Sequence, residues 1–174
     1  MNSEILVIDD QPDLRFMVCN ILEEKNFIVR SAANYDQAVM EIKKKLPDLA
    51  ILDIKLDKSE KDGIDLLKLI MKLNKSIPVI MISGHATTQL AVEAIKIGAY
   101  EFVEKPFSTE KILNYVYRAL ENYKLKKEKD ILENKLFHSF DLVGESSLMV
   151  KVRKTIEKLS STDSRVLIYG PTGT

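Results

Sequence analysis

Short, strongly apolar runs that alternate with amphipathic segments constrain the fold of this chain more than any other feature. Three runs of four residues lie at 5–8, 49–52 and 79–82, and a shorter one lies at 102–103. Runs of this length and composition are typical of strands buried on both faces of a parallel sheet. Since helical patterns fill the intervals between them, the sequence predicts an α/β fold: a doubly wound parallel sheet with helices on both faces.

The intervals carry clear helix signals. Pro12 suits the first turn of a helix, apolar residues recur at helical spacing over 35–45, and Gly63 opens a third helix. Gly98 is placed to end a fourth helix, because glycine readily adopts the backbone conformation that follows a helix C-terminus. A further short strand is predicted at 27–29, which brings the predicted sheet to five strands.

Polar side chains stand where the predicted strands end. Asp9 and Asp10 follow the first apolar run, and Asp53 follows the second. Ser83 ends the third, and Lys105 comes shortly after the last. Because the carboxyl ends of parallel strands lie on one edge of an open sheet, we expect these groups to share one crevice, where such folds bind ligands.

The crevice has the chemistry of a magnesium and phosphoryl site. Carboxylate oxygens are hard ligands suited to Mg²⁺, which commonly takes one or two carboxylates together with phosphate oxygens. Carboxylates about 5 Å apart repel by roughly 3 kcal/mol per pair at an effective dielectric of about 20, so Lys105 or a metal ion must offset their charge. Asp53 is the natural nucleophile towards phosphorus, and Ser83 can donate to a resulting phosphoryl oxygen.

Each of these features alone has a simpler explanation. An acidic pair after a strand more often caps the next helix, and a lone aspartate at a strand end more often forms a turn. Their order and spacing together are specific, and over residues 1–122 the chain resembles the receiver domain of bacterial two-component response regulators. The resemblance implies a flavodoxin-like sheet with strand order 2-1-3-4-5.

The resemblance also implies roles for individual residues. It makes Asp53 the phospho-acceptor, with Asp10 and Asp53 as direct Mg²⁺ ligands and Asp9 acting through water. The remaining implied positions are the backbone carbonyl of Lys55 as a metal ligand, and Ser83, Phe102, Lys105 and Pro106 as the signalling switch, with a cis peptide bond before the proline. The chain would then be a phosphorylation switch that takes its phosphoryl group from a sensor histidine kinase and dimerises on phosphorylation, and not a classical enzyme.

Two departures from the family pattern stand out. The loop over 54–63 is longer than usual and lacks the usual proline, and Gln11 stands where many relatives have a third acidic residue. The long loop resembles the NtrX branch of the NtrC-type regulators, as do the segments at 81–85 and 98–107. His85, two residues beyond Ser83, is either a contact for a water molecule or an exposed helix-start residue.

The last helix predicted to pack on the sheet starts near Ser108, and the composition of the sequence changes after it. Charges of both signs dominate 123–139, which suits a solvated helical linker or a short coiled coil.

A new apolar pattern over 140–174 includes a predicted strand at 166–169 and resembles the start of the AAA+ ATPase domain of sigma-54-dependent activators. The chain closes on the first part of a phosphate-binding loop pattern, formed by Gly170, Pro171, Thr172, Gly173 and Thr174. We therefore expect a fragment of a longer protein, with regions 1–122, 123–139 and 140–174.

Composition excludes several classes. Lys and Arg total 26, as do Asp and Glu, so no net positive charge favours nucleic acid. No apolar run approaches the roughly 20 residues that span a membrane. The single cysteine, Cys19, has no disulfide partner and fits a reducing cytoplasm. ATP, DNA and sigma-54 RNA polymerase are expected as partners of longer relatives only.

Two alternative functions remain. A haloacid-dehalogenase-like phosphatase also uses Asp, Ser or Thr, and Lys, but it needs its nucleophile in a D-x-D pattern on the first strand, and Asp9-Asp10 does not provide one. A P-loop ATPase needs the lysine that reaches the β- and γ-phosphates, which the chain does not include.

Overall fold

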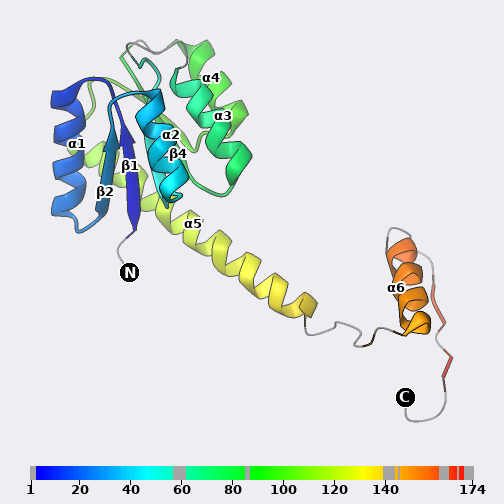
Figure 1. The fold of residues 1–174 in the computed structure, drawn as a ribbon. Coiled ribbons are helices and arrows are strands. Elements are labelled where there is room, and N and C mark those ends of the chain that lie inside the picture. The colour runs from blue at the N-terminus through cyan, green and yellow to red at the C-terminus, as the bar shows by residue number, and fades with distance from the viewer. Residues whose placement is uncertain are drawn as a thin grey trace. The chain divides into compact units, whose positions relative to one another are not determined.

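The computed structural model describes residues 3–56, 62–84, 87–138, 144, 146–160, 165–167, 169 and 170. The chain divides into two compact units, Met1–Asp130 and Ile131–Thr174. Figure 1 shows the sheet and its helices in the first unit and the helix α6 in the second. Among the described residues, no helix is both long and apolar enough to cross a membrane.

The first unit is built on a five-stranded sheet in which every neighbouring pair is parallel. The strand order is β2-β1-β3-β4-β5, as the family resemblance implied. The strands are β1 (Glu4–Ile8), β2 (Ile28–Ala32), β3 (Leu49–Asp53), β4 (Val79–Ser83) and β5 (Glu101–Glu104). The order places the ends of β1, β3 and β4 side by side at the centre of one sheet edge.

Helices follow the strands, and local signals explain where they start and stop. They are α1 (Pro12–Glu24), α2 (Tyr35–Lys44), α3 (Gly63–Leu73), α4 (Thr88–Ile97) and α5 (Thr109–His138). Side chains of Asn34, Asp62 and Thr87 accept hydrogen bonds from backbone N–H groups in the first turns of α2, α3 and α4. Gly98 ends α4 with φ of 127°, a conformation that favours glycine.

Alternate residues of the strands fill two separate cores. Leu6 and Ile8 of β1 pack with α2, α3 and α4, whereas Ile5 and Val7 pack with α1 and α5. Figure 1 shows these helices on the two faces of the sheet. All five residues of β1, β3 and β4 are buried, which explains why these strands read as unbroken apolar runs.

Strand β2 differs from the prediction in its bounds. It spans Ile28–Ala32, not 27–29, and so includes the polar residues Arg30 and Ser31. An edge strand with one neighbour tolerates such residues, and Arg30 pairs with Glu4 and Glu41. Lys45 is the main group that lowers the pKa of Glu4, against the effect of burial and with the help of Arg30.

In the second unit, α6 spans Ser147–Leu159 and starts at Ser146, whose hydroxyl accepts the backbone N–H of Met149. Most of the larger apolar residues of α6 are exposed, among them Leu148 and Ile156. The strand predicted at 166–169 is wrong for the part that the structure describes: 165–167 and 169 form no strand, and Leu167 is 73% exposed. A strand needs a neighbour to satisfy its backbone groups, and the described residues of this unit supply none.

Candidate functional site

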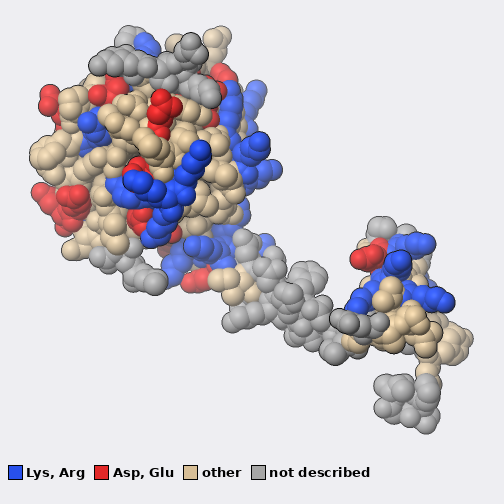
Figure 2. Space-filling model, viewed as in Figure 1, with Lys and Arg blue, Asp and Glu red and all other residues tan. Residues whose placement is uncertain are grey.

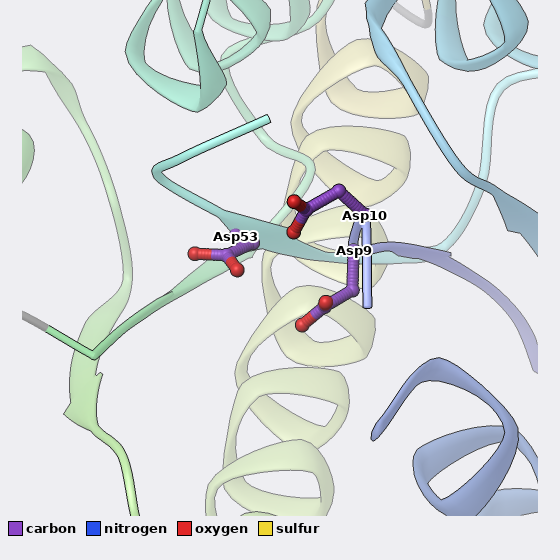
Figure 3. A group of neighbouring side chains, drawn as sticks. All are labelled: Asp9, Asp10 and Asp53. Carbon is purple, nitrogen blue, oxygen red and sulfur yellow. The ribbon is translucent and has the colours of Figure 1, made fainter. Parts of the chain in front are cut away.

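Three carboxylates converge at the carboxyl edge of the sheet. Asp9 and Asp10 follow β1, and Asp53 is the last residue of the adjacent strand β3. One oxygen from each lies within 4.8 Å of the other two (Figure 3). Asp9 and Asp53 are buried and Asp10 is partly exposed. The structure thus brings together the acidic residues that the sequence placed in one crevice.

Lys105 reaches this cluster from the loop after β5. Its Nζ lies 2.9 Å from Oδ2 of Asp9 and 2.6 Å from Oδ2 of Asp53. Its backbone N–H donates to the carbonyl of Ser83 at 2.8 Å, and its peptide bond to Pro106 is cis. The ammonium therefore offsets part of the repulsion between the carboxylates.

Burial and ion pairing have opposite effects on the pKa values of Asp53 and Lys105. Burial raises the pKa of the Asp53 carboxyl, although the hydrogen bond from Lys105 opposes the shift. Burial alone would lower the pKa of Lys105, but the hydrogen bonds to Asp53 and Asp9 outweigh it and raise the pKa. The folded protein thus holds a carboxylate whose charge its surroundings disfavour, beside a lysine that they keep charged.

The cluster fits a hard divalent cation. Three carboxylate oxygens can share one ion, and a single ammonium leaves them with an excess of negative charge. All the ligand atoms are oxygens, the type that Mg²⁺ prefers over softer donors. Asp9, Asp10 and Asp53 are therefore the residues that would hold Mg²⁺.

The backbone after β3 is held close to Asp53. The backbone N–H of Lys55 donates to Oδ1 of Asp53 at 3.3 Å, and the N–H of Gly63 donates to the carbonyl of Ile54 at 2.9 Å. A Cβ at Gly63 would lie 2.0 Å from the carbonyl oxygen of Asp53. Gly63 is therefore needed for this close approach, a role that its position at the start of a predicted helix did not reveal.

Of the remaining predicted positions, Ser83 lies in β4 and Phe102 in β5. Ser83 is buried at the end of β4, next to β3. Phe102 of β5 packs partly against the core shared with α4, and with Val92 and Ile95 it lines a surface hollow of about 380 Å³. His85 and the loop at 57–61 lie outside the described residues, as do the last four residues of the partial phosphate-binding loop; only Gly170 of that loop is described, and it is exposed.

Sequence reasoning missed two contacts that hold Asp9. The backbone N–H of Gln11 donates to Oδ1 of Asp9 at 2.8 Å. The guanidinium of Arg15, in the first turn of α1, donates through Nη1 to the carbonyl oxygen of Asp9 at 2.5 Å. An arginine near the start of a helix does not by itself predict such a contact. The contact depends on the direction of the helix relative to the preceding strand, which the sequence pattern does not give.

Comparisons with known proteins agree with this geometry. The family model of the response regulator receiver domain matches residues 5–117. The nitrogen assimilation regulatory protein NtrX of Azorhizobium caulinodans is 41% identical over 173 residues, which cover 99% of this chain and 38% of that protein. The chain therefore spans less than two fifths of that relative's length.

Solved structures of receiver domains are similar as well. The receiver domain of NtrX from Brucella abortus is 44% identical with a TM-score of 0.64, over 67% of this chain and 98% of that one. The beryllofluoride-activated receiver domain dimer of NtrC4 is 35% identical with a TM-score of 0.65, over 69% of this chain and 98% of that one. The chain belongs to the response regulator receiver family, and within it resembles the NtrX branch of the NtrC-type regulators.

Proposed function

We propose that this chain is a phosphorylation switch in which Asp53 accepts a phosphoryl group from a partner histidine kinase. The observation that carries the proposal is the convergence of Asp9, Asp10 and Lys105 on Asp53. Membership of the receiver family supports it. The chemistry is a transfer between proteins, so the domain is not a classical enzyme.

The proposed step transfers one phosphoryl group and needs no reactant beyond the kinase's phosphohistidine and a proton from solvent. A carboxylate oxygen of Asp53 attacks the phosphorus of the kinase's phosphohistidine, so that an O–P bond forms and the P–N bond breaks. The bonding pair stays on the imidazole nitrogen, which takes a proton from solvent. Lys105 and the hydroxyl of Ser83 then donate to phosphoryl oxygens of the product.

Metal binding completes the proposed site. Asp10 and Asp53 would bind Mg²⁺ directly, Asp9 would act through water, and the carbonyl of Lys55 would be a further ligand. When bound, Mg²⁺ supplies positive charge that offsets the phosphoryl oxygens. The chain's own residues set the alignment, because Asp9 and Asp53 are both held by Lys105.

The output we propose is a change in shape that promotes a dimer. Ser83 and Phe102 would reposition after phosphorylation, and Phe102 already borders the hollow beside α4. The face formed by α4, β5 and α5 carries exposed apolar residues, among them Val92 and Ile95 of α4. The activated NtrC4 receiver domain is a dimer, which supports this assignment.

We place the switch within a longer cytoplasmic regulator. The regions proposed are a receiver at 1–122, a helical linker at 123–139 and the start of an AAA+ domain at 140–174. ATP, sigma-54 RNA polymerase and DNA would then be partners of the longer protein. The face of the first unit shown in Figure 2 carries both signs of charge.

Intact mass spectrometry after incubation with acetyl phosphate and Mg²⁺ tests the proposal. We expect one added phosphoryl group on the wild type and none on Asp53→Asn. Asp36→Asn, a change at an exposed aspartate of α2, is the matched control and should still accept the group. Equal uptake by Asp53→Asn and the wild type would refute the assignment.

A further inference from the structure

Arg15 lies in α1, outside the acidic cluster, and contacts the backbone of Asp9. We propose that Arg15 is a positioning residue that orients the Asp9–Asp10 pair for Mg²⁺. The proposal rests on the function proposed above, because it assumes that the carboxylates bind the metal. Its basis is the 2.5 Å hydrogen bond from Nη1 of Arg15 to the backbone carbonyl of Asp9.

That carbonyl belongs to the peptide unit that joins the two aspartates. The unit is planar and rigid, so a hydrogen bond to its oxygen also restrains the nitrogen and Cα of Asp10. Arg15 is itself held, since its backbone N–H donates to the carbonyl of Gln11 at 3.0 Å in the first turn of α1. The helix thereby sets the direction in which the Asp10 side chain leaves the chain.

Asp10 depends on this backbone support more than Asp9 does. The side chain of Asp9 is held through Oδ1 by the N–H of Gln11 and through Oδ2 by Lys105. Among the described residues, the Asp10 carboxylate has no hydrogen bond or ion pair of its own. Figure 3 shows the two carboxylates leaving the end of β1 in different directions, with Asp53 beside them. The restraint on the peptide unit therefore matters more for the placement of Asp10 than for that of Asp9.

A positioning role and a purely electrostatic role predict opposite signs. A guanidinium near the cluster repels Mg²⁺, so removing its charge alone would strengthen metal binding. Removing a hydrogen bond that orients a metal ligand weakens binding, typically by about tenfold or more. The sign of the change in Mg²⁺ affinity therefore separates the two roles.

The experiment measures the Mg²⁺ dissociation constant by calorimetry for the wild type and three variants. Arg15→Met removes the donor and the charge but keeps an apolar stem, and Arg15→Lys keeps the charge without the guanidinium geometry. Arg118→Met is the matched control, because Arg118 is an exposed arginine of α5. Amide NMR shifts of Asp10 in metal-free protein give a second readout that does not depend on metal.

We expect Mg²⁺ affinity to fall about tenfold in Arg15→Met and also to fall in Arg15→Lys, with no change in Arg118→Met. The Asp10 amide should shift in both Arg15 variants, and phosphorylation by acetyl phosphate should need more Mg²⁺ yet reach the wild-type rate at saturation. Unchanged or tighter Mg²⁺ binding in Arg15→Met would overturn the proposal, as would an equal loss in Arg118→Met. If the wild type itself bound no Mg²⁺, the proposed function would fail instead.

Discussion

At the scale of single residues, the site balances function against stability. Asp53 is buried beside Asp9, and Lys105 offsets only part of their charge. Burial raises the pKa of Asp53, so the folded state disfavours the carboxylate that the proposed chemistry needs. Such sites are commonly less stable than a neutral replacement would be.

This balance predicts that Asp53→Asn has a higher melting temperature than the wild type at pH 7 without metal. The pKa of the Asp53 carboxyl is higher in the folded protein than its ordinary value of 3.8. Such a group lowers the free energy of unfolding as the pH rises from the ordinary pKa to the folded-state pKa, and the loss persists at higher pH. The gain in the variant should therefore shrink as the pH falls towards 3.8. Added Mg²⁺ should stabilise the wild type more than the variant. Calorimetric scans measure both effects, and a lower melting temperature for metal-free Asp53→Asn at pH 7 would contradict the account.

Lys105 should matter more for the response than for acceptance of the phosphoryl group. Its ammonium pairs with Asp53 and is placed to contact a phosphoryl group there. We expect Lys105→Ala to gain mass with acetyl phosphate but to dimerise less when phosphorylated, as light scattering would measure. Lys72→Ala, an exposed lysine of α3, should behave as the wild type in both assays. A dimer of normal strength in Lys105→Ala would show that the lysine does not sense the new charge.

At the scale of elements, the packing of α3 against the end of β3 positions Asp53. Gly63 begins α3 and lies against the carbonyl of Asp53, where no Cβ fits. Because the atoms nearest to that position belong to the backbone of Asp53 and Ile54, a larger residue must displace the helix or the strand.

We therefore expect Gly63→Ala to lower the free energy of unfolding by about 2 kcal/mol or more, as overpacking does. It should also slow phosphorylation of Asp53. Gly84→Ala is the control, because its Cβ would lie 4.0 Å from Cδ of Lys105, an ordinary contact. Urea titrations of both variants give the comparison. Equal stability of the two variants would mean that α3 moves away from Asp53 at little cost.

The α4–β5–α5 face should form the dimer. We expect beryllofluoride with Mg²⁺ to double the mass measured by light scattering, and Ile95→Asp, which places a charge among exposed apolar residues of α4, to prevent it. Ile28→Asp, at an exposed apolar position on the opposite edge strand β2, is the control and should still dimerise. An unchanged mass in the wild type at high concentration would count against this interface.

Much of the site was predictable because its residues stand at the ends of strands that are neighbours in the sheet. Once the apolar runs indicate a parallel sheet, Asp9, Asp53 and Ser83 must meet at one edge. The roles of Gly63 and Arg15 could not be predicted in the same way, since they depend on the distance between a helix start and a strand end. The bounds of β2 were missed because polar residues are tolerated at an edge strand, and the strand at 166–169 was wrong because apolar character alone does not supply a pairing neighbour.

At the scale of the whole molecule, the two units differ in how much apolar surface they bury. The first unit has two continuous cores, whereas most of the larger apolar residues described in 146–170 are exposed. Backbone with few buried contacts opens more readily. The units should therefore differ in resistance to proteases.

Limited trypsin digestion should cut residues 131–174 first and leave a fragment close to Met1–Asp130. The fragment should keep the far-ultraviolet circular dichroism of an α/β domain and still accept a phosphoryl group from acetyl phosphate. Mass spectrometry of the time course identifies the cuts. Early cleavage inside α1 or α3, at a rate equal to that in α6, would contradict the division into a stable and a less stable unit.

The central claim is that Asp53 carries the phosphoryl group. The most direct measurement is borohydride reduction of the phosphorylated protein, which converts an aspartyl phosphate to homoserine, followed by peptide mass spectrometry. The account predicts homoserine at position 53 in the presence of Mg²⁺, and none there when Mg²⁺ is chelated. Homoserine at Asp9 or Asp10 instead, or an unmodified residue 53 in protein that has gained a phosphoryl group, would contradict it.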